Sequence, residues 1–417
     1  MTRLTTPIAI NRAIDDVLRR DRGRLVAGLV ARLGDLQLAE DALQDAAISA
    51  MSHWGRSGLP HSPTAWLMRV AANKGIDRAR STRRDIGKAT RWKAWHDANH
   101  DTADDALIPD ERLRLIFACC HPVLEEKSRV ALTLRVVCGL TTREIASAFL
   151  DRDGTLGQRI SRAKDKLRAA GCGYEVPDRA SWPARLDAVL STIYLVFTTG
   201  YATEDESDRD LCAEAIFLLR LLDRLHPGDP EIEGALALLL LTDARSAARI
   251  GSDGATVPPD RQNRLRWNRL EVEEGREILA SAVRRGRPGP YQIKAAIADC
   301  HMLEPDVDWK QISLLYGSLW LHEPTPVVAL NWSVALGKLG QPELALEKIE
   351  ELGAELSGYQ PYHAARAELL GQLGRNEDAR SAYDTAIALA RHGAARLFLE
   401  KRRQTCRAPS PARDGLG

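Results

Sequence analysis

The sequence predicts an all-α protein made of several helical domains. Hydrophobic residues recur at helical spacing along most of the chain, and the alternation typical of strands is nearly absent. The chain has 417 residues, enough for two or three domains of ordinary size. Hydrophobic residues make up 44% of it and charged residues 28%, as in soluble globular proteins and unlike disordered or collagen-like chains.

The sequence also argues against a membrane-spanning, secreted or disulfide-rich protein. No apolar run approaches the ~18 residues that a membrane span requires, and charges interrupt the first thirty residues where a signal peptide would be apolar. The seven cysteines are odd in number and widely scattered, which favours a reducing compartment over a disulfide framework. We therefore expect a cytoplasmic protein without a membrane partner.

The net charge of +1 conceals two oppositely charged parts. Residues 1–170 contain 29 Lys and Arg against 21 Asp and Glu, a net charge of +8. The remaining residues contain 29 against 36, a net charge of −7. A basic N-terminal part predicts a polyanionic partner, and nucleic acid is the first candidate.

The first clear helix is expected at residues 36–54. Small and apolar residues fall on one of its faces, which we expect to pack. The opposite arc is polar and acidic, and we expect it to lie away from the packed face: Glu40, Asp41, Gln44 and Asp45.

A loop rich in Gly, Ser and Pro follows at residues 55–63 and leads into a second helix at residues 65–84. Between residues 66 and 93 there are nine Lys and Arg against two Asp. Residues 94–111 then contain six acidic residues and no basic ones. We therefore place an acidic linker at residues 91–111, between two small domains.

The next helical unit ends in a helix-turn-helix. Thr141-Thr142-Arg143-Glu144 has the pattern of a capping box, residues 151–154 break the helix, and Thr155-Leu156-Gly157-Gln158 has the same pattern again. In the helix expected behind it, Leu156, Ile160, Ala163 and Leu167 align in one stripe. Its polar side can enter a major groove, with Gln158 and Arg162 toward base edges and Arg159 and Lys166 beside them.

Residues 180–400 form a series of helices separated by Gly, Pro and Asp turns. Leu339-Gly340 recurs as Leu373-Gly374, Glu343 as Glu377 and Ala345 as Ala379, all offset by 34 residues. This is the period of tetratricopeptide repeats. We expect the last residues, 401–417, to be disordered.

Residues 10–170 resemble the two-domain core of an extracytoplasmic-function RNA polymerase sigma factor. The resemblance lies in three pairs of segments: 33–35 with 39–45, 64–67 with 73–78, and 140–146 with 159–164. It implies a region 2-like domain at residues 10–90 and a region 4-like helix-turn-helix domain at residues 112–172. Residues 173–400 resemble the tetratricopeptide-like extension of a subset of these sigma factors, which is thought to regulate or support activity in cis.

The resemblance also implies roles for individual residues. Core RNA polymerase would be bound by Asp35, Glu40, Asp41, Gln44 and Asp45. The −10 promoter element would be melted and read by Trp66, Arg69, Asn73, Lys74, Asp77, Arg78 and Arg80, with the loop at 55–63 helping to capture an unpaired base. The −35 element would be read by Arg143, Thr155, Gln158, Arg159, Arg162 and Lys166.

We therefore expect a sigma factor, which is not an enzyme and needs no cofactor, with core RNA polymerase and promoter DNA as partners. A protein or peptide ligand of the repeat domain is a further partner to consider, because such repeats stack into concave surfaces. The alternative is a one-component helix-turn-helix regulator whose repeat domain senses a ligand or peptide. Cys119-Cys120-His121, with Cys138 nearby, lacks the spacing of a tetrahedral zinc site, so we expect no metal.

Overall fold

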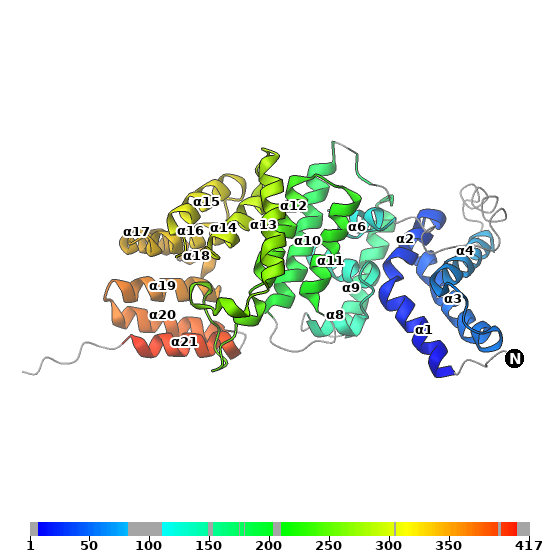
Figure 1. The fold of residues 1–417 in the computed structure, drawn as a ribbon, viewed down its shortest axis with the longest axis horizontal. Helices are drawn as coiled ribbons and strands as arrows, with labels where there is room; N and C mark the ends of the chain where they lie inside the picture. Colours follow the sequence, from blue (N-terminus) through cyan, green and yellow to red (C-terminus); the bar gives the residue numbers. More distant parts are fainter. Residues whose placement is uncertain are drawn as a thin grey trace, which may run out of the picture. The chain divides into compact units, whose positions relative to one another are not determined.

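The computed structural model describes residues 7–81, 111–148, 153–174, 176–178, 180–202, 210–303, 306–390 and 393–406. Over these ranges the regular structure is helical, apart from one isolated bridge between Ile250 and Thr256, so the all-α prediction is confirmed. The chain divides into two compact units (Figure 1). The first comprises Met1–Gly200 with Asp205–Leu221, and the second comprises Tyr201–Glu204 with Leu222–Gly417.

The first unit begins with four helices that share one core. They are α1 (Pro7–Arg20), α2 (Arg22–Leu33), α3 (Leu36–Ser57) and α4 (Pro63–Ser81). Helix α4 packs on α2 and α3, and Trp54, Leu25 and Leu67 are fully buried between these helices.

Local sequence explains where these helices begin and end. Gly34 ends α2 in the left-handed conformation, with φ of 73°. The Asp35 carboxylate then accepts a hydrogen bond from the Leu38 N–H at 2.8 Å and caps α3. Because α3 continues to Ser57, residues 55–57 are helical, and the sequence-based loop prediction of 55–63 was wrong there.

Four further helices form the second part of this unit: α6 (Arg112–Cys119), α7 (Glu126–Val136), α8 (Thr142–Ala148) and α9 (Asp153–Ala169). The first capping box is confirmed, because Thr141 N–H donates to Glu144 at 2.6 Å and Glu144 N–H donates to the Thr141 hydroxyl at 3.1 Å. The second is wrong, because α9 already begins at Asp153 and Thr155 lies inside its first turn. The predicted linker lies outside the described residues except for Glu111, which pairs with Arg114 at 3.0 Å.

Most of α10 (Trp182–Ala202) and most of α11 (Leu211–Leu225) also belong to the first unit. The ring of Trp182 lies 5.0 Å from that of Phe117, which is fully buried. Arg185 donates a 2.6 Å hydrogen bond to the Phe117 carbonyl, and the guanidinium of Arg112 lies over the ring of Phe217. The division into compact units therefore differs from the predicted boundary at 172/173, because α10 and α11 complete the packing around α6.

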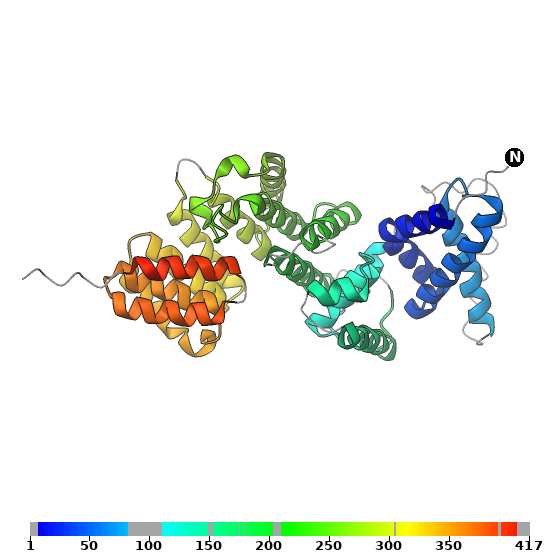
Figure 2. The same cartoon turned by 90° about the horizontal axis from the view of Figure 1, so that it is seen from below.

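The second unit is a succession of helices, each packed on its neighbours. They are α12 (Pro230–Asp243), α13 (Arg269–Arg284), α14 (Pro290–Cys300), α15 (Trp309–His322), α16 (Pro326–Lys338), α17 (Pro342–Glu351), α18 (Gly353–Leu356), α19 (Gln360–Gln372), α20 (Asn376–Leu389) and α21 (Gly393–Thr405). Between α12 and α13 the chain has only three short 3-10 turns, η2 (Ser246–Ala248), η3 (Pro259–Arg261) and η4 (Arg264–Arg266). Figure 2 shows α19, α20 and α21 lying side by side.

The 34-residue offset in the sequence corresponds to two equivalent helical hairpins. The last residues of α16 and α19 are 34 positions apart in the sequence, and the first residues of α17 and α20 are also 34 positions apart. Gly340 and Gly374 occupy the two turns with φ of 80° and 72°. The residues expected to pack are buried: Ala345, Ala379, Tyr383 and Ala386.

The prediction that residues 401–417 are disordered was wrong for the first five of them. They complete α21, whose Leu399 is buried in the hairpin core. Ion pairs fix this last turn, since Arg402 pairs with Glu368 and Arg403 with Asp384. Residues 407–417 lie outside the described residues.

The packing of α10 and α11 on α6 predicts which N-terminal fragment is stable. We expect fragment 1–172 to unfold at lower urea concentration than fragment 1–228, because it uncovers Phe117 and removes its Trp182 and Arg185 partners. Losing a large buried aromatic contact costs ~3–5 kcal/mol. Circular dichroism during urea unfolding measures the difference in midpoint. The control is Trp182→Ala in the full-length chain, which removes the same ring without truncating the backbone. Equal midpoints for the two fragments would contradict this packing.

Candidate nucleic-acid and polymerase-binding surfaces

Helix α9 has three distinct faces. Its apolar face is buried, with Leu156, Ile160, Ala163 and Leu167 packed inside the unit. At 3.6 residues per turn, all but one of the residues expected at the −35 element share a second face. On this face Thr155, Gln158, Arg162 and Lys166 are exposed and Arg159 is half-buried. The remaining residue, Arg143, is exposed on α8.

The third face of α9 carries Lys164 and Arg168, roughly opposite the second one around the helix. These two side chains point toward the turn between α2 and α3 and toward α3 itself. Lys164 pairs with Glu40, and Arg168 lies 3.5 Å from Asp35. One side of α9 therefore contacts the N-terminal helices while its opposite side faces solvent.

Helix α4 separates its residues in a similar way. Its buried side carries Leu67, Met68, Ala71 and Ala72. Most residues expected at the −10 element lie on the opposite side: Trp66 and Arg69 half-buried, and Asn73, Asp77 and Arg80 exposed.

Of the two remaining −10 residues, Lys74 is half-buried and Arg78 reaches two carboxylates of α3. It lies 2.8 Å from Asp45 and 3.4 Å from Asp41. The structure therefore joins one predicted DNA-binding residue to two predicted polymerase-binding residues.

Aromatic rings cluster where α3 and α4 flank the loop between them. The ring of His53 stacks on Trp66 with centroids 5.4 Å apart and planes inclined by 26°. Trp54 meets the same indole edge-on, also at 5.4 Å. The start of α4 is fixed by the Ser62 hydroxyl, which accepts from the Ala65 N–H at 3.2 Å. A stacked pair of this kind offers a surface on which an unpaired base can stack.

The residues expected to bind polymerase are only partly accessible. Gln44 is exposed, and Asp35, Asp41 and Asp45 are half-buried in ion pairs or caps. Glu40 is 9% exposed, so the expectation that it lies away from the packed face was wrong. Helical periodicity placed it correctly with its acidic neighbours, but α9 covers this position from a distant part of the chain.

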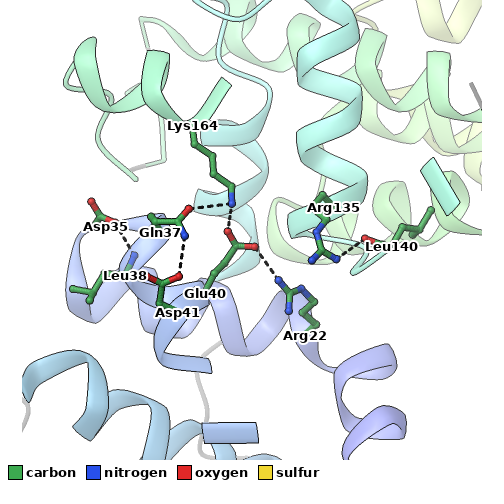
Figure 3. Close-up of polar contacts among 9 residues, drawn as sticks. All are labelled: Arg22, Asp35, Gln37, Leu38, Glu40, Asp41, Arg135, Leu140 and Lys164. Atoms are coloured by element: carbon green, nitrogen blue, oxygen red, sulfur yellow. Dashed lines mark hydrogen bonds and ion pairs between the residues drawn. The ribbon is translucent and has the colours of Figure 1, made fainter. Parts of the chain in front are cut away.

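Glu40 joins three helices through its two carboxylate oxygens (Figure 3). Arg22 of α2 donates to one oxygen at 2.8 Å, and Lys164 of α9 pairs with the other. The Lys164 ammonium also contacts the Gln37 amide oxygen at 3.4 Å. Both side chains of the pair are largely buried, with 15% of Lys164 and 9% of Glu40 exposed.

Backbone packing reinforces this contact. Gly23 of α2 lies against the Val137 carbonyl at the end of α7, where a methyl group in place of the glycine hydrogen would approach the oxygen to 2.1 Å. Tyr174, just beyond α9, contacts the backbone of Leu36, and burial raises the pKa of its phenol. A cavity of about 330 Å³ remains beside these contacts, lined in part by Asp35 and Arg168.

Sequence reasoning did not identify Arg22, Lys164, Arg168 and Tyr174 as interface residues. For Lys164 and Arg168 a signal existed, because helical-wheel geometry places both away from the apolar stripe and away from the residues expected to bind DNA. Nothing in the sequence indicated that this third face meets α3.

Three cysteines of the first unit lie in its interior. Cys119, Cys120 and Cys138 are all buried, and burial raises the pKa of the Cys119 and Cys120 thiols. Within the described ranges, no group of three or more His, Cys, Asp or Glu side chains is arranged to hold a metal ion. None of the helices described is long and apolar enough to cross a membrane.

Three segments of the chain match known protein families. Residues 17–85 match Sigma-70 region 2, and residues 114–167 match Sigma-70, region 4. Residues 185–283 match a family of unknown function, DUF6596. The first match contains α4 and the second contains nearly all of α9, the two helices on which most of the expected DNA-binding residues lie.

Individual proteins, two of them named as sigma factors, are also similar to this chain. Uncharacterized protein R00370 of Rhizobium meliloti (strain 1021) is 42% identical over 93% of this chain and 94% of its own length. The ECF RNA polymerase sigma factor SigK of Mycobacterium ulcerans is 31% identical over 34% of this chain and 78% of its own. The RNA polymerase sigma-H factor of Pseudomonas aeruginosa is 28% identical over 38% and 86%. No solved structure matches the chain.

The buried pair between Glu40 and Lys164 predicts strong energetic coupling. We expect Glu40→Gln and Lys164→Met each to lower the free energy of unfolding by ~2–4 kcal/mol, because each leaves a desolvated charge with one partner fewer. The double variant should lose less than the sum by at least ~1 kcal/mol, as urea denaturation would show. Arg162→Met, on the opposite face of α9, is the control and should change stability by no more than ~0.5 kcal/mol. Strictly additive losses would contradict a direct interaction.

Proposed function

Because this chain belongs to the extracytoplasmic-function family of RNA polymerase sigma factors, we propose that it binds polymerase through α3 and reads promoter DNA through α4 and α9. Sigma factors are not enzymes, and polymerase carries out the chemistry of transcription. This chain is such a sigma factor with a C-terminal helical extension, working with core RNA polymerase and promoter DNA. Its place of action, on this proposal, is the cytoplasm.

The observation that carries the proposal is the division of α9 into opposite faces. A helix that enters a major groove must present polar side chains on one side and a rigid support on the others. Gln158 and Arg162 are exposed on one side of α9, and the buried stripe and the Glu40 contact lie elsewhere on the helix. We assign Gln158 and Arg162 to base edges and Lys166 to phosphate, since Arg and Gln pair with base edges and Lys neutralises the backbone.

The −10 element requires a different surface, because a melted strand exposes bases as well as phosphates. The stacked rings of Trp66 and His53 are suited to an unpaired base. Asn73 and Arg80 extend from the same side of α4 and would follow the strand with polar and cationic contacts. Melting is therefore assigned to the surface at the start and along the exposed side of α4.

Two of the residues assigned to polymerase also form ion pairs within the chain. If Glu40 and Asp35 contact polymerase, the ion pairs to Lys164 and Arg168 must first break, because one carboxylate edge cannot serve both partners. We infer that α9 leaves α3 when polymerase binds. Such an exchange would couple polymerase binding to a change in the position of α9.

The extension is assigned a regulatory role in cis. Support comes from α10 and α11, which lie within the family match at residues 185–283 for most of their length and also pack against α6 of the helix-turn-helix part. A change in these helices would reach α9 through α6 and α7, since α6 packs on α7 and α7 packs on α9. A protein or peptide ligand of the hairpins at α16 to α20 remains part of this proposal.

Promoter reading by α9 can be tested through Arg162. We expect Arg162→Ala to weaken −35 recognition by ~1–3 kcal/mol, because a bidentate contact to a guanine edge is lost. Run-off transcription with purified core polymerase and a genomic promoter library measures the effect. Lys127→Ala removes one exposed positive charge from the same domain and is the matched control. Equal output from the two variants would contradict the assignment of α9.

The exchange at α3 can be tested by removing the cations that cover it. We expect Lys164→Met combined with Arg168→Met to bind core polymerase about tenfold more tightly, equivalent to about 1.4 kcal/mol, because no ion pair has to break. Fluorescence anisotropy with labelled protein measures the dissociation constant. Arg162→Met, which lies on the opposite face, should bind as the wild type does. Unchanged or weaker binding by the double variant would show that α9 does not compete with polymerase.

A further inference from the structure

The segment between α12 and α13 is unusual for a helical repeat domain. Residues 244–268 contain only η2, η3, η4 and the bridge between Ile250 and Thr256. Connections in compact domains are usually much shorter, and long ones without regular structure often carry a function. This segment also lies inside the match to a family of unknown function.

Arg245 begins this segment and is buried with unsatisfied donors. Its residue is 7% exposed, and neither Nε nor Nη1 has an acceptor within hydrogen-bond distance among the described residues. Other arginines of this unit are paired: Arg285 donates to Glu233 at 2.9 Å, and Arg264 donates to the Leu303 carbonyl at 2.8 Å. A buried guanidinium with two unsatisfied donors is unfavourable, and native proteins rarely retain buried donors of this kind without a reason.

His301, on whose pKa the charge of Arg245 acts, is a second buried polar group of this unit. The His301 imidazole packs edge-on against Trp309 at 5.3 Å, and its Nδ1 is buried without a partner. Burial and the charge of Arg245 lower the pKa of His301 to about 4, so the ring is neutral at pH 7. Asp260, which raises this pKa, lies 3.7 Å from Lys338.

We propose that Arg245 anchors a binding site for a small ligand bearing an oxyanion, a carboxylate or a phosphate. The planar guanidinium recognises either group through charge-assisted hydrogen bonds. The site lies in the extension and uses no residue assigned to polymerase or promoter, so it stands apart from the proposed function.

The ligand-site proposal makes a specific prediction for Arg245→Met. In buffer free of phosphate and carboxylate, the variant should unfold at least ~2 °C higher than the wild type, because an uncompensated buried charge is replaced by an apolar side chain of similar length. Inorganic phosphate or acetate should raise the unfolding temperature of the wild-type full-length protein in a saturable manner and leave the variant unchanged. A response to phosphate alone would identify the ligand group as a phosphate, and a response to acetate alone would identify it as a carboxylate.

Equilibrium dialysis with labelled phosphate and labelled acetate provides the direct measurement. We expect saturable binding of at least one anion to the wild type, at least tenfold weaker binding to Arg245→Lys, and none to Arg245→Met. Arg261→Met removes an exposed cation of the same segment and should bind as the wild type does. The proposal is overturned if neither anion binds saturably, if Arg245→Met binds equally well, or if that variant is less stable than the wild type without anion, since Arg245 would then be a structural residue.

Discussion

The arrangement of the N-terminal unit depends on the carboxylate of Glu40. A carboxylate buried to this degree is stable only when cations or donors surround it, and here they come from two other helices, Arg22 on α2 and Lys164 on α9. The requirement for both partners fixes α9 against α3 in one orientation. That orientation in turn determines that the side of α9 with Gln158 and Arg162 faces outward.

Much of the local structure could be predicted from the sequence. The capping box at Thr141 and Glu144, the helices at α3 and α4, and the two hairpins offset by 34 residues all depend on residues close together in the chain. Neighbouring residues are enough to determine such features, because caps, turns and amphipathic faces are short-range effects. The family resemblance reached further than local patterns, since it depends on motifs in both halves of the N-terminal unit.

The contacts between distant segments could not be predicted in the same way. Lys164 and Glu40 are 124 residues apart, and Arg185 and the Phe117 carbonyl are 68 apart. A helical wheel shows that Lys164 lies on a polar face but not which surface that face meets. The same limit explains the boundary at residue 172: the helices α10 and α11 have the composition of the extension, and only tertiary packing shows that they complete the core around α6.

Gly23 gives this unit a feature that could be used to engineer it. The absence of a side chain lets α2 lie directly against the Val137 carbonyl, so the backbones of the two helical parts meet closely at this position. Replacing the glycine by alanine, serine and valine in turn would insert wedges of increasing volume at that point. A single position thus offers a graded spacer between the two helical parts, adjustable without changing any residue that we assign to DNA.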